Sequence, residues 1–179
     1  MDNGISSRRL TQTAYHQFDS CYRMLETLVD VTPGTLWLET FHAVPFWYQV
    51  YHVVYFVDYW FREDFAATDF LCMTFNKRIP PEFEHDVPEG VFIPQDEMRE
   101  YLRHVREKFE TIFRMLDDET LAQGIGYREA QITWLDVILT QTRHVMYNVG
   151  YCNGILRGQN LAESDWYAYN ETEDSSSVN

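Results

Sequence analysis

Apolar side chains recur at the three-to-four-residue spacing of an α-helix in three long segments of this chain. In residues 11–29, Phe18, Tyr22, Leu25 and Val29 form one apolar stripe, and Pro33 with Gly34 ends the segment. The second stripe begins near residue 95 and contains Met98, Leu102, Val105, Phe109, Ile112 and Leu116. The third runs over residues 128–158 and contains Ile132, Leu135, Leu139, Val145, Val149, Cys152 and Leu156. Helices with one apolar face must bury it against other elements, so the chain is expected to pack helix on helix.

A fourth segment, residues 45–61, consists almost entirely of aromatic and β-branched residues. Such residues alone favour a strand, but a run of this length without a turn signal favours a mostly buried helix. Pro45 suits the first turn of that helix.

The stretch from residue 65 to residue 94 is expected to be an irregular crossover, because Pro80, Pro81, Pro88, Gly90 and Pro94 interrupt any periodic pattern. Residues 117–121 resemble a capped short turn. Four long helices with a long crossover between the second and third indicate an all-α fold, a four-helix bundle. We assign the bundle to residues 11–169, a flexible N-terminus to residues 1–10, and a disordered acidic tail to residues 170–179.

Length, charge and cysteine spacing limit the classes of protein to which this chain can belong. The 179 residues suffice for one domain with its own core. The net charge of −14 argues against nucleic acid as a partner. Cys21, Cys72 and Cys152 show no zinc-site spacing, and no signal peptide or membrane-spanning run is visible. We therefore expect a cytoplasmic protein that does not enter a membrane.

His144 and Asn148 are separated by one helical turn, and His52 lies in the middle of the aromatic segment. An i, i+4 pair shares one helix face, which is how a helix offers two ligands to one metal ion. His52, His144 and Asn148 are thus candidate ligands for a divalent metal such as Zn, Ni, Fe or Mn. Asn is a weaker ligand than His, so the affinity is expected to fall, or the site to be empty. A site without metal, in which Asn148 hydrogen-bonds a histidine or water, is at least equally consistent with the sequence.

Four further residues are candidates for a substrate pocket: Tyr48, Tyr55, Tyr59 and Gln141. Tyrosines at this spacing are as consistent with a core whose hydroxyl groups reach the rim. Asp58 and Asp136 are candidate acceptors for an imidazole N–H, although surface or capping roles explain them equally well.

Gly150, Gly154 and Gly158 recur every four residues in the last helical segment. Glycine costs about 1 kcal/mol in a helix, so this repeat favours close approach of another backbone. That backbone belongs either to the same bundle or to a second subunit.

Two segments carry a resemblance to a known family: residues 51–61 (YHVVYFVDYWF) and residues 143–157 (RHVMYNVGYCNGILR). They resemble the DinB/YfiT-like superfamily, and residues 100–108 (EYLRHVREK) extend the similarity over most of residues 10–160. The resemblance implies a four-helix bundle, often dimeric, with three metal-binding histidines, one on the second helix and two on the last. The first two positions fall on His52 and His144, but the third falls on Asn148.

Two functions follow from this resemblance. The first is a divalent-metal-dependent thiol transferase or hydrolase with a degenerate His/His/Asn site. The alternative is a non-catalytic protein of the same fold that has lost the metal and binds a small molecule or acts as a dimeric interaction protein. A homodimer is expected in both cases.

Overall fold

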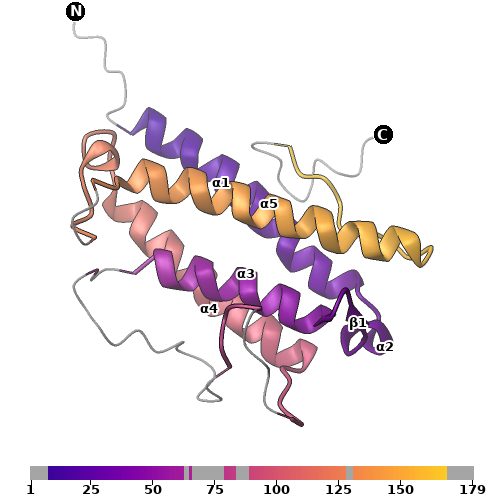
Figure 1. Cartoon of the computed structure of the whole chain (residues 1–179). Coiled ribbons are helices and arrows are strands. Elements are labelled where there is room, and N and C mark those ends of the chain that lie inside the picture. Colours follow the sequence, from indigo (N-terminus) through magenta and orange to yellow (C-terminus); the bar gives the residue numbers. More distant parts are fainter. Residues whose placement is uncertain (1–7, 63–64, 66–78, 84–88, 128–130, 169–179) are drawn as a thin grey trace, which may run out of the picture.

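Four long helices form the protein in the computed structural model, which describes residues 8–62, 65, 79–83, 89–127 and 131–168. The helices are α1 (Arg9–Val31), α3 (Phe46–Trp60), α4 (Gln95–Met115) and α5 (Trp134–Gly158) (Figure 1). The short helix α2 (Gly34–Trp37) and strands β1 (Thr40–Phe41) and β2 (Val44–Pro45) connect α1 to α3, and the 3₁₀ turn η1 (Thr120–Ala122) follows α4. The all-α fold expected from the sequence is confirmed.

The long helices surround a common core in which α1 and α3 each pack against both α4 and α5. Helices α3 and α4 run parallel: the ring of Tyr51 lies beside that of Tyr101, and further along both helices Asp58 pairs with Lys108. The chain must therefore return along the whole length of the bundle between α3 and α4. This parallel arrangement accounts for the long crossover expected there.

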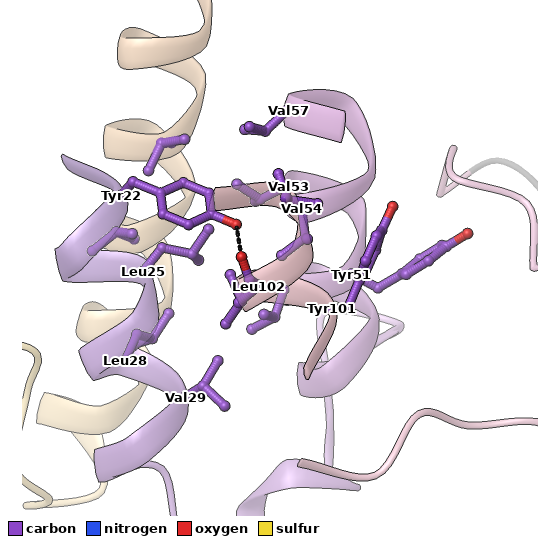
Figure 2. Packing of buried hydrophobic residues seen from close by; sticks show 14 of the residues in the cluster. Tyr22, Leu25, Leu28, Val29, Tyr51, Val53, Val54, Val57, Tyr101 and Leu102 are labelled. Atoms are coloured by element: carbon purple, nitrogen blue, oxygen red, sulfur yellow. Dashed lines mark hydrogen bonds between the residues drawn. The ribbon is translucent and has the colours of Figure 1, made fainter. Parts of the chain in front are cut away.

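Aromatic and aliphatic side chains of all four helices fill the core. Figure 2 shows Tyr22, Leu25 and Leu28 of α1 facing Val53 and Val54 of α3. The buried hydroxyl group of Tyr22 donates a hydrogen bond of 2.9 Å to the carbonyl oxygen of Leu102 on α4. Each fully buried aliphatic side chain contributes roughly 1.5–3 kcal/mol to folding, so the helices hold together chiefly through this packing.

Helix α5 begins later than the apolar pattern indicated, at Trp134 and not near residue 128. Thr133 and Asp136 form a capping box in which each side chain accepts a hydrogen bond from the other's backbone N–H. Just before it, the carbonyl oxygen of Ile132 accepts a hydrogen bond of 2.9 Å from the amide of Ile125, which ties Ile132 to the segment after η1 and not into a helix. The expected start was wrong because the apolar pattern includes Ile132 but does not reveal the cap.

The other boundaries lie close to their expected positions. Helix α1 extends two residues beyond the expected stripe at each end, α3 starts directly after Pro45, and α4 starts at Gln95. The turn at residues 117–121 is capped by Asp117, whose carboxylate accepts hydrogen bonds from the amides of Glu119 and Thr120. The sequence did not indicate the hairpin of β1 and β2, in which His42 and Ala43 have positive φ angles of 48° and 70°.

Some expectations concern residues outside the described part of the chain. These are the acidic tail at residues 170–179, most of the N-terminal segment 1–10 and much of the crossover. Within the described residues, the helices all lack the length or hydrophobicity that a membrane span requires.

Candidate functional site

Two imidazole rings meet where α3 and α5 pack against each other. The Nε2 atoms of His52 and His144 lie 3.1 Å apart, and the ring planes are inclined at 72°. Helical periodicity turns both side chains to the same interhelical face. The structure therefore brings together the two histidines singled out in the sequence.

The hydrogen bonds of the two rings determine which nitrogen atoms carry protons. Nδ1 of His52 lies 2.7 Å from the carbonyl oxygen of Pro81, which can only accept, so this nitrogen is the donor. In a neutral ring, Nε2 of His52 then has a free lone pair and accepts from Nε2–H of His144. Neutral His144 is left with a bare Nδ1, which is buried and has no hydrogen-bond partner.

Burial keeps the pair neutral. Desolvation, followed by the charge of His52, lowers the pKa of His144 from 6.5 to about 4. Desolvation also lowers the pKa of His52, although its hydrogen bond to Pro81 acts in the opposite direction. Both imidazoles are therefore neutral at pH 7, so neither ring needs a carboxylate nearby to balance a positive charge.

The side-chain amide of Asn148 is bonded at both ends. Its Nδ2 donates a hydrogen bond of 2.8 Å to the carbonyl oxygen of His144, one turn earlier in α5. Its Oδ1 accepts a short hydrogen bond from Nε2 of Gln49 on α3. Asn148 is only 4% exposed, so these bonds satisfy an amide that has almost no access to solvent.

Residues 79–83 of the crossover cover the imidazole pair. The hydroxyl groups of Tyr48 and Tyr51 and the ring of His52 together bind the carbonyl oxygens of four successive residues, Ile79, Pro80, Pro81 and Glu82. The ring of Phe83 stacks on His52 with 4.3 Å between the ring centres. From the other side, Phe56 packs its edge against both imidazoles. The pair is thus enclosed by aromatic rings and backbone.

The four residues expected to line a substrate pocket lie in three different surroundings. The hydroxyl group of Tyr48 binds the crossover, as described above. Tyr55 and Tyr59 stack on each other, and the hydroxyl group of Tyr59 lies 3.3 Å from that of Tyr127. Gln141 is buried one turn before His144, and its Oε1 has no hydrogen-bond partner. A single pocket lined by all four therefore stays a prediction.

Neither aspartate considered as a partner of an imidazole takes that role. Asp58 is 1% exposed, pairs with the ammonium group of Lys108 and accepts a hydrogen bond of 2.9 Å from the hydroxyl group of Tyr101. Asp136 caps α5, as described above. Asp136 thus has the capping role that the sequence left open, whereas Asp58 is a buried ion-pair partner, which neither of its sequence alternatives described.

Gln49 is a site residue that sequence reasoning missed. A signal for it existed, because Gln49, His52 and Asp58 are the residues of α3 other than Val, Phe, Tyr and Trp. Gln49 also precedes His52 by one turn, which places the two on the same helix face.

The residues fit a divalent metal only in part. His52 has the arrangement typical of a metal-bound histidine, in which one ring nitrogen donates to a carbonyl oxygen and the other is free to bind the ion. His144 lacks such a second partner for Nδ1, and the amide oxygen of Asn148 already accepts a hydrogen bond from Gln49, which fixes its direction. In the described part of the chain, no three His, Cys, Asp or Glu side chains are grouped as metal ligands.

A bundle of four long helices with facing imidazoles between two of them defines the class of protein: an all-α bundle with a polar site in its interior. The chain belongs to the DinB superfamily, whose family model matches residues 14–152. No curated protein and no solved structure matches the chain.

Proposed function

We propose that this protein is a non-catalytic, cytoplasmic member of the DinB superfamily that has given up a three-ligand metal centre and binds a small molecule. The observation that carries the loss of the metal is the double engagement of the Asn148 amide by Gln49 and by the carbonyl oxygen of His144. The amide oxygen keeps a second lone pair, but these two bonds fix the direction of the side chain. If Asn148 turned towards an ion beside the imidazoles, it would break its bond to Gln49 and leave a buried amide without an acceptor. That loss costs about 1–3 kcal/mol, and an amide oxygen is a weak ligand for the metals that imidazole prefers.

His144 supports the same proposal. Binding an ion at Nε2 would move its proton to Nδ1, which is buried and has no acceptor. Metal-bound histidines normally donate that second N–H to a carbonyl oxygen or carboxylate. The proton is more favourable on Nε2 of His144, where it forms the hydrogen bond to Nε2 of His52.

The test is the metal content of protein purified without an affinity tag or chelator, measured by elemental analysis. We expect far less than one transition-metal ion per chain in the native protein. Asn148→His restores the third imidazole, and this variant should take up more Zn²⁺ or Ni²⁺ in a titration than the native protein does. Asn153→His, on the same helix but away from the imidazole pair, is the matched control and should gain nothing.

One result would overturn the proposal: a native protein that carries close to one transition-metal ion per chain and loses it on His52→Ala. Circular dichroism of each variant separates loss of the ion from loss of the fold.

A second candidate function rests on the distance between the two imidazoles. Two nitrogen ligands at about 2.0–2.1 Å from a tetrahedral ion lie about 3.3 Å apart, close to the 3.1 Å between Nε2 of His52 and Nε2 of His144. These two side chains would hold a divalent metal, which lowers the pKa of a bound thiol or water. A metal-dependent thiol transferase or hydrolase would then follow, and the metal analysis above decides between the two candidates.

A further inference from the structure

A pocket of about 370 Å³ lies near the C-terminal end of α3 and the first turns of α5, and it is distinct from the imidazole pair. Its lining residues come from α3, from α5 and from the extended residues before α5: Trp60, Gln131, Ile132, Asp136, Val137, Thr140 and Gln141. The volume lies within the range of small-molecule sites, about 300–1,000 Å³. Trp60, Ile132 and Val137 give the pocket an apolar wall.

Gln141 is the polar group of this wall that lacks a partner. The residue is 3% exposed, and its Oε1 is shielded from solvent without a hydrogen bond. Buried polar groups normally have partners, so an unbonded amide on a pocket wall indicates a partner that the protein itself does not supply. The terminal torsion of glutamine is soft and roughly two-fold, so a half-turn about it exchanges the places of Oε1 and Nε2 and would make the acceptor available to a ligand.

The charge of the pocket selects against anions. Asp136 lies on the lining, and its carboxylate is ionised at pH 7, since hydrogen bonds from Thr133 lower a pKa that is ordinarily already well below 7. The chain as a whole carries a net charge of −14. A ligand carboxylate or phosphate would meet repulsion both at the pocket and over the surface.

We propose that this pocket binds a neutral, largely apolar molecule that donates an N–H hydrogen bond to Oε1 of Gln141, such as an aromatic carboxamide. This inference rests on the small-molecule-binding function proposed above and assigns it a site. The metal content and the ligand binding are measured separately, so either proposal can fail while the other stands.

The experiment compares three probes of similar shape with the full-length protein: benzamide, methyl benzoate and benzoate. Benzamide is neutral and donates N–H, methyl benzoate is neutral without a donor, and benzoate is an anion. Binding is followed by tryptophan fluorescence and by the side-chain amide NMR signal of Gln141. We expect benzamide to bind at least about tenfold more tightly than either of the other probes.

Two variants locate the binding. Gln141→Leu keeps the apolar bulk and removes the acceptor, so it should abolish the preference for benzamide over methyl benzoate. Thr140→Trp fills the rim of the pocket from an exposed position and should weaken binding of benzamide at least about tenfold. Thr13→Trp, an exposed threonine of α1 outside this pocket, is the matched control and should bind like the native protein.

Equal binding of the three probes, absence of benzamide binding at millimolar concentration, or full binding by Thr140→Trp would each overturn the assignment. Thermal unfolding of each variant shows whether it is folded. If Gln141→Leu fails to fold, the amide signal of Gln141 in the native protein still gives the answer, because it must shift on addition of benzamide.

Discussion

Gln49 and Asn148 form a buried pair of amides from two different helices. Replacing either one by leucine leaves the other with an unmet hydrogen bond, which is expected to cost about 1–3 kcal/mol of unfolding free energy. Replacing both removes both polar groups, so the double variant should lose less than the sum of the single variants. Urea unfolding of the native protein and the three variants measures this coupling.

If the loss of unfolding free energy in the double variant equals the sum of the two single losses to within about 0.5 kcal/mol, the pairing is contradicted. Residues in direct contact should couple. In that case the amide of Asn148 would be free to turn towards the imidazoles, and the metal-binding candidate would gain support.

The imidazole pair makes stability depend on pH. His144 has a pKa of about 4 in the folded protein and about 6.5 when unfolded, so between these values the unfolded chain binds more protons. Stability is therefore fully present above about pH 6.5 and falls as the pH drops towards 4. We expect the melting temperature to decrease over this window and His144→Gln to make the decrease shallower. The same slope in His144→Gln as in the native protein would assign the effect to other groups.

The sequence indicated that His52 and His144 could face each other, and their rings do meet, but a metal site at His52, His144 and Asn148 stays a prediction. The helical period alone turns both histidines to the interface between the second and last long helices. The orientation of the Asn148 amide depends on Gln49, which lies far away in the chain and meets it only in the fold. No spacing within one helix predicts a partner of that kind.

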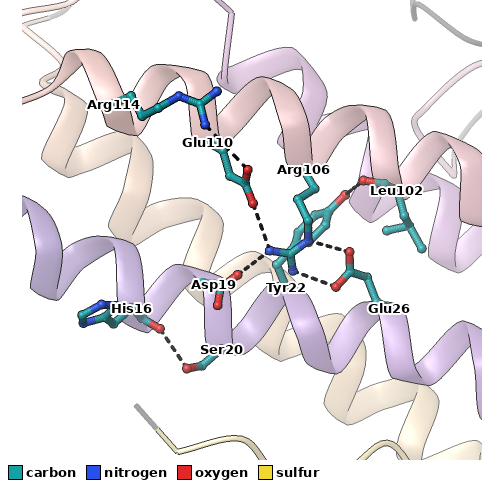
Figure 3. A network of polar contacts seen from close by, with 9 residues as sticks. All are labelled: His16, Asp19, Ser20, Tyr22, Glu26, Leu102, Arg106, Glu110 and Arg114. Carbon is teal, nitrogen blue, oxygen red and sulfur yellow. Dashed lines mark hydrogen bonds and ion pairs between the residues drawn. The ribbon is translucent and has the colours of Figure 1, made fainter. Parts of the chain in front are cut away.

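At the scale of elements, Arg106 of α4 joins its helix to α1 (Figure 3). Its guanidinium group binds both carboxylate oxygens of Glu26, at 2.8 and 2.7 Å, and also pairs with Asp19. The side chain is 22% exposed, so the group is less screened than a surface ion pair. Arg106→Met would leave Asp19 and Glu26, two turns apart on α1, without the cation that they share.

We expect Arg106→Met to lower the unfolding free energy by roughly 1–3 kcal/mol. Arg103→Met is the matched control, since the pair of Arg103 with Glu107 is more than half exposed and should contribute less than about 0.5 kcal/mol. Denaturant unfolding of the two variants checks the difference. Equal effects would mean that the contact with α1 adds nothing to the fold.

The elements themselves were largely predictable, and their ends less so. The apolar stripes located α1, α4 and α5 because burial imposes their period, and the length of the aromatic run without a turn signal located α3. The start of α5 was misplaced because it depends on the capping box of Thr133 and Asp136. An apolar pattern does not reveal such a cap. The hairpin before α3 escaped notice because its strands are two residues each, too short to show alternation.

For the whole molecule, the outer face of α5 is the surface on which we expect a second copy to bind. A Cβ atom at Gly150, Gly154 or Gly158 would meet nothing within 4 Å, so no backbone in the described part of the chain makes the close approach that these glycines permit. Tyr147 and Leu139 on the same helix are 78% and 52% exposed. Contact of this glycine repeat with a second subunit stays a prediction.

Light scattering after size exclusion should show a dimer. Gly154→Leu should weaken it, raising the dissociation constant at least about tenfold, which corresponds to 1.4 kcal/mol. The monomer should remain folded, since leucine favours a helix more than glycine and meets open space here. Glu107→Leu, an exposed position on α4, is the control. A native protein that is monomeric at all concentrations tested would contradict the expectation.

The order of the helices around the bundle also determines when the chain can fold. Helix α1 is synthesised first, but it packs chiefly against α4 and α5, which emerge from the ribosome last. Until α5 is complete, α1 and the aromatic α3 can pack chiefly against α4 alone, so part of their apolar surface stays uncovered. Contacts between such distant segments slow folding and expose apolar surface in the intermediate. The core of the bundle should therefore close only after α5 has emerged.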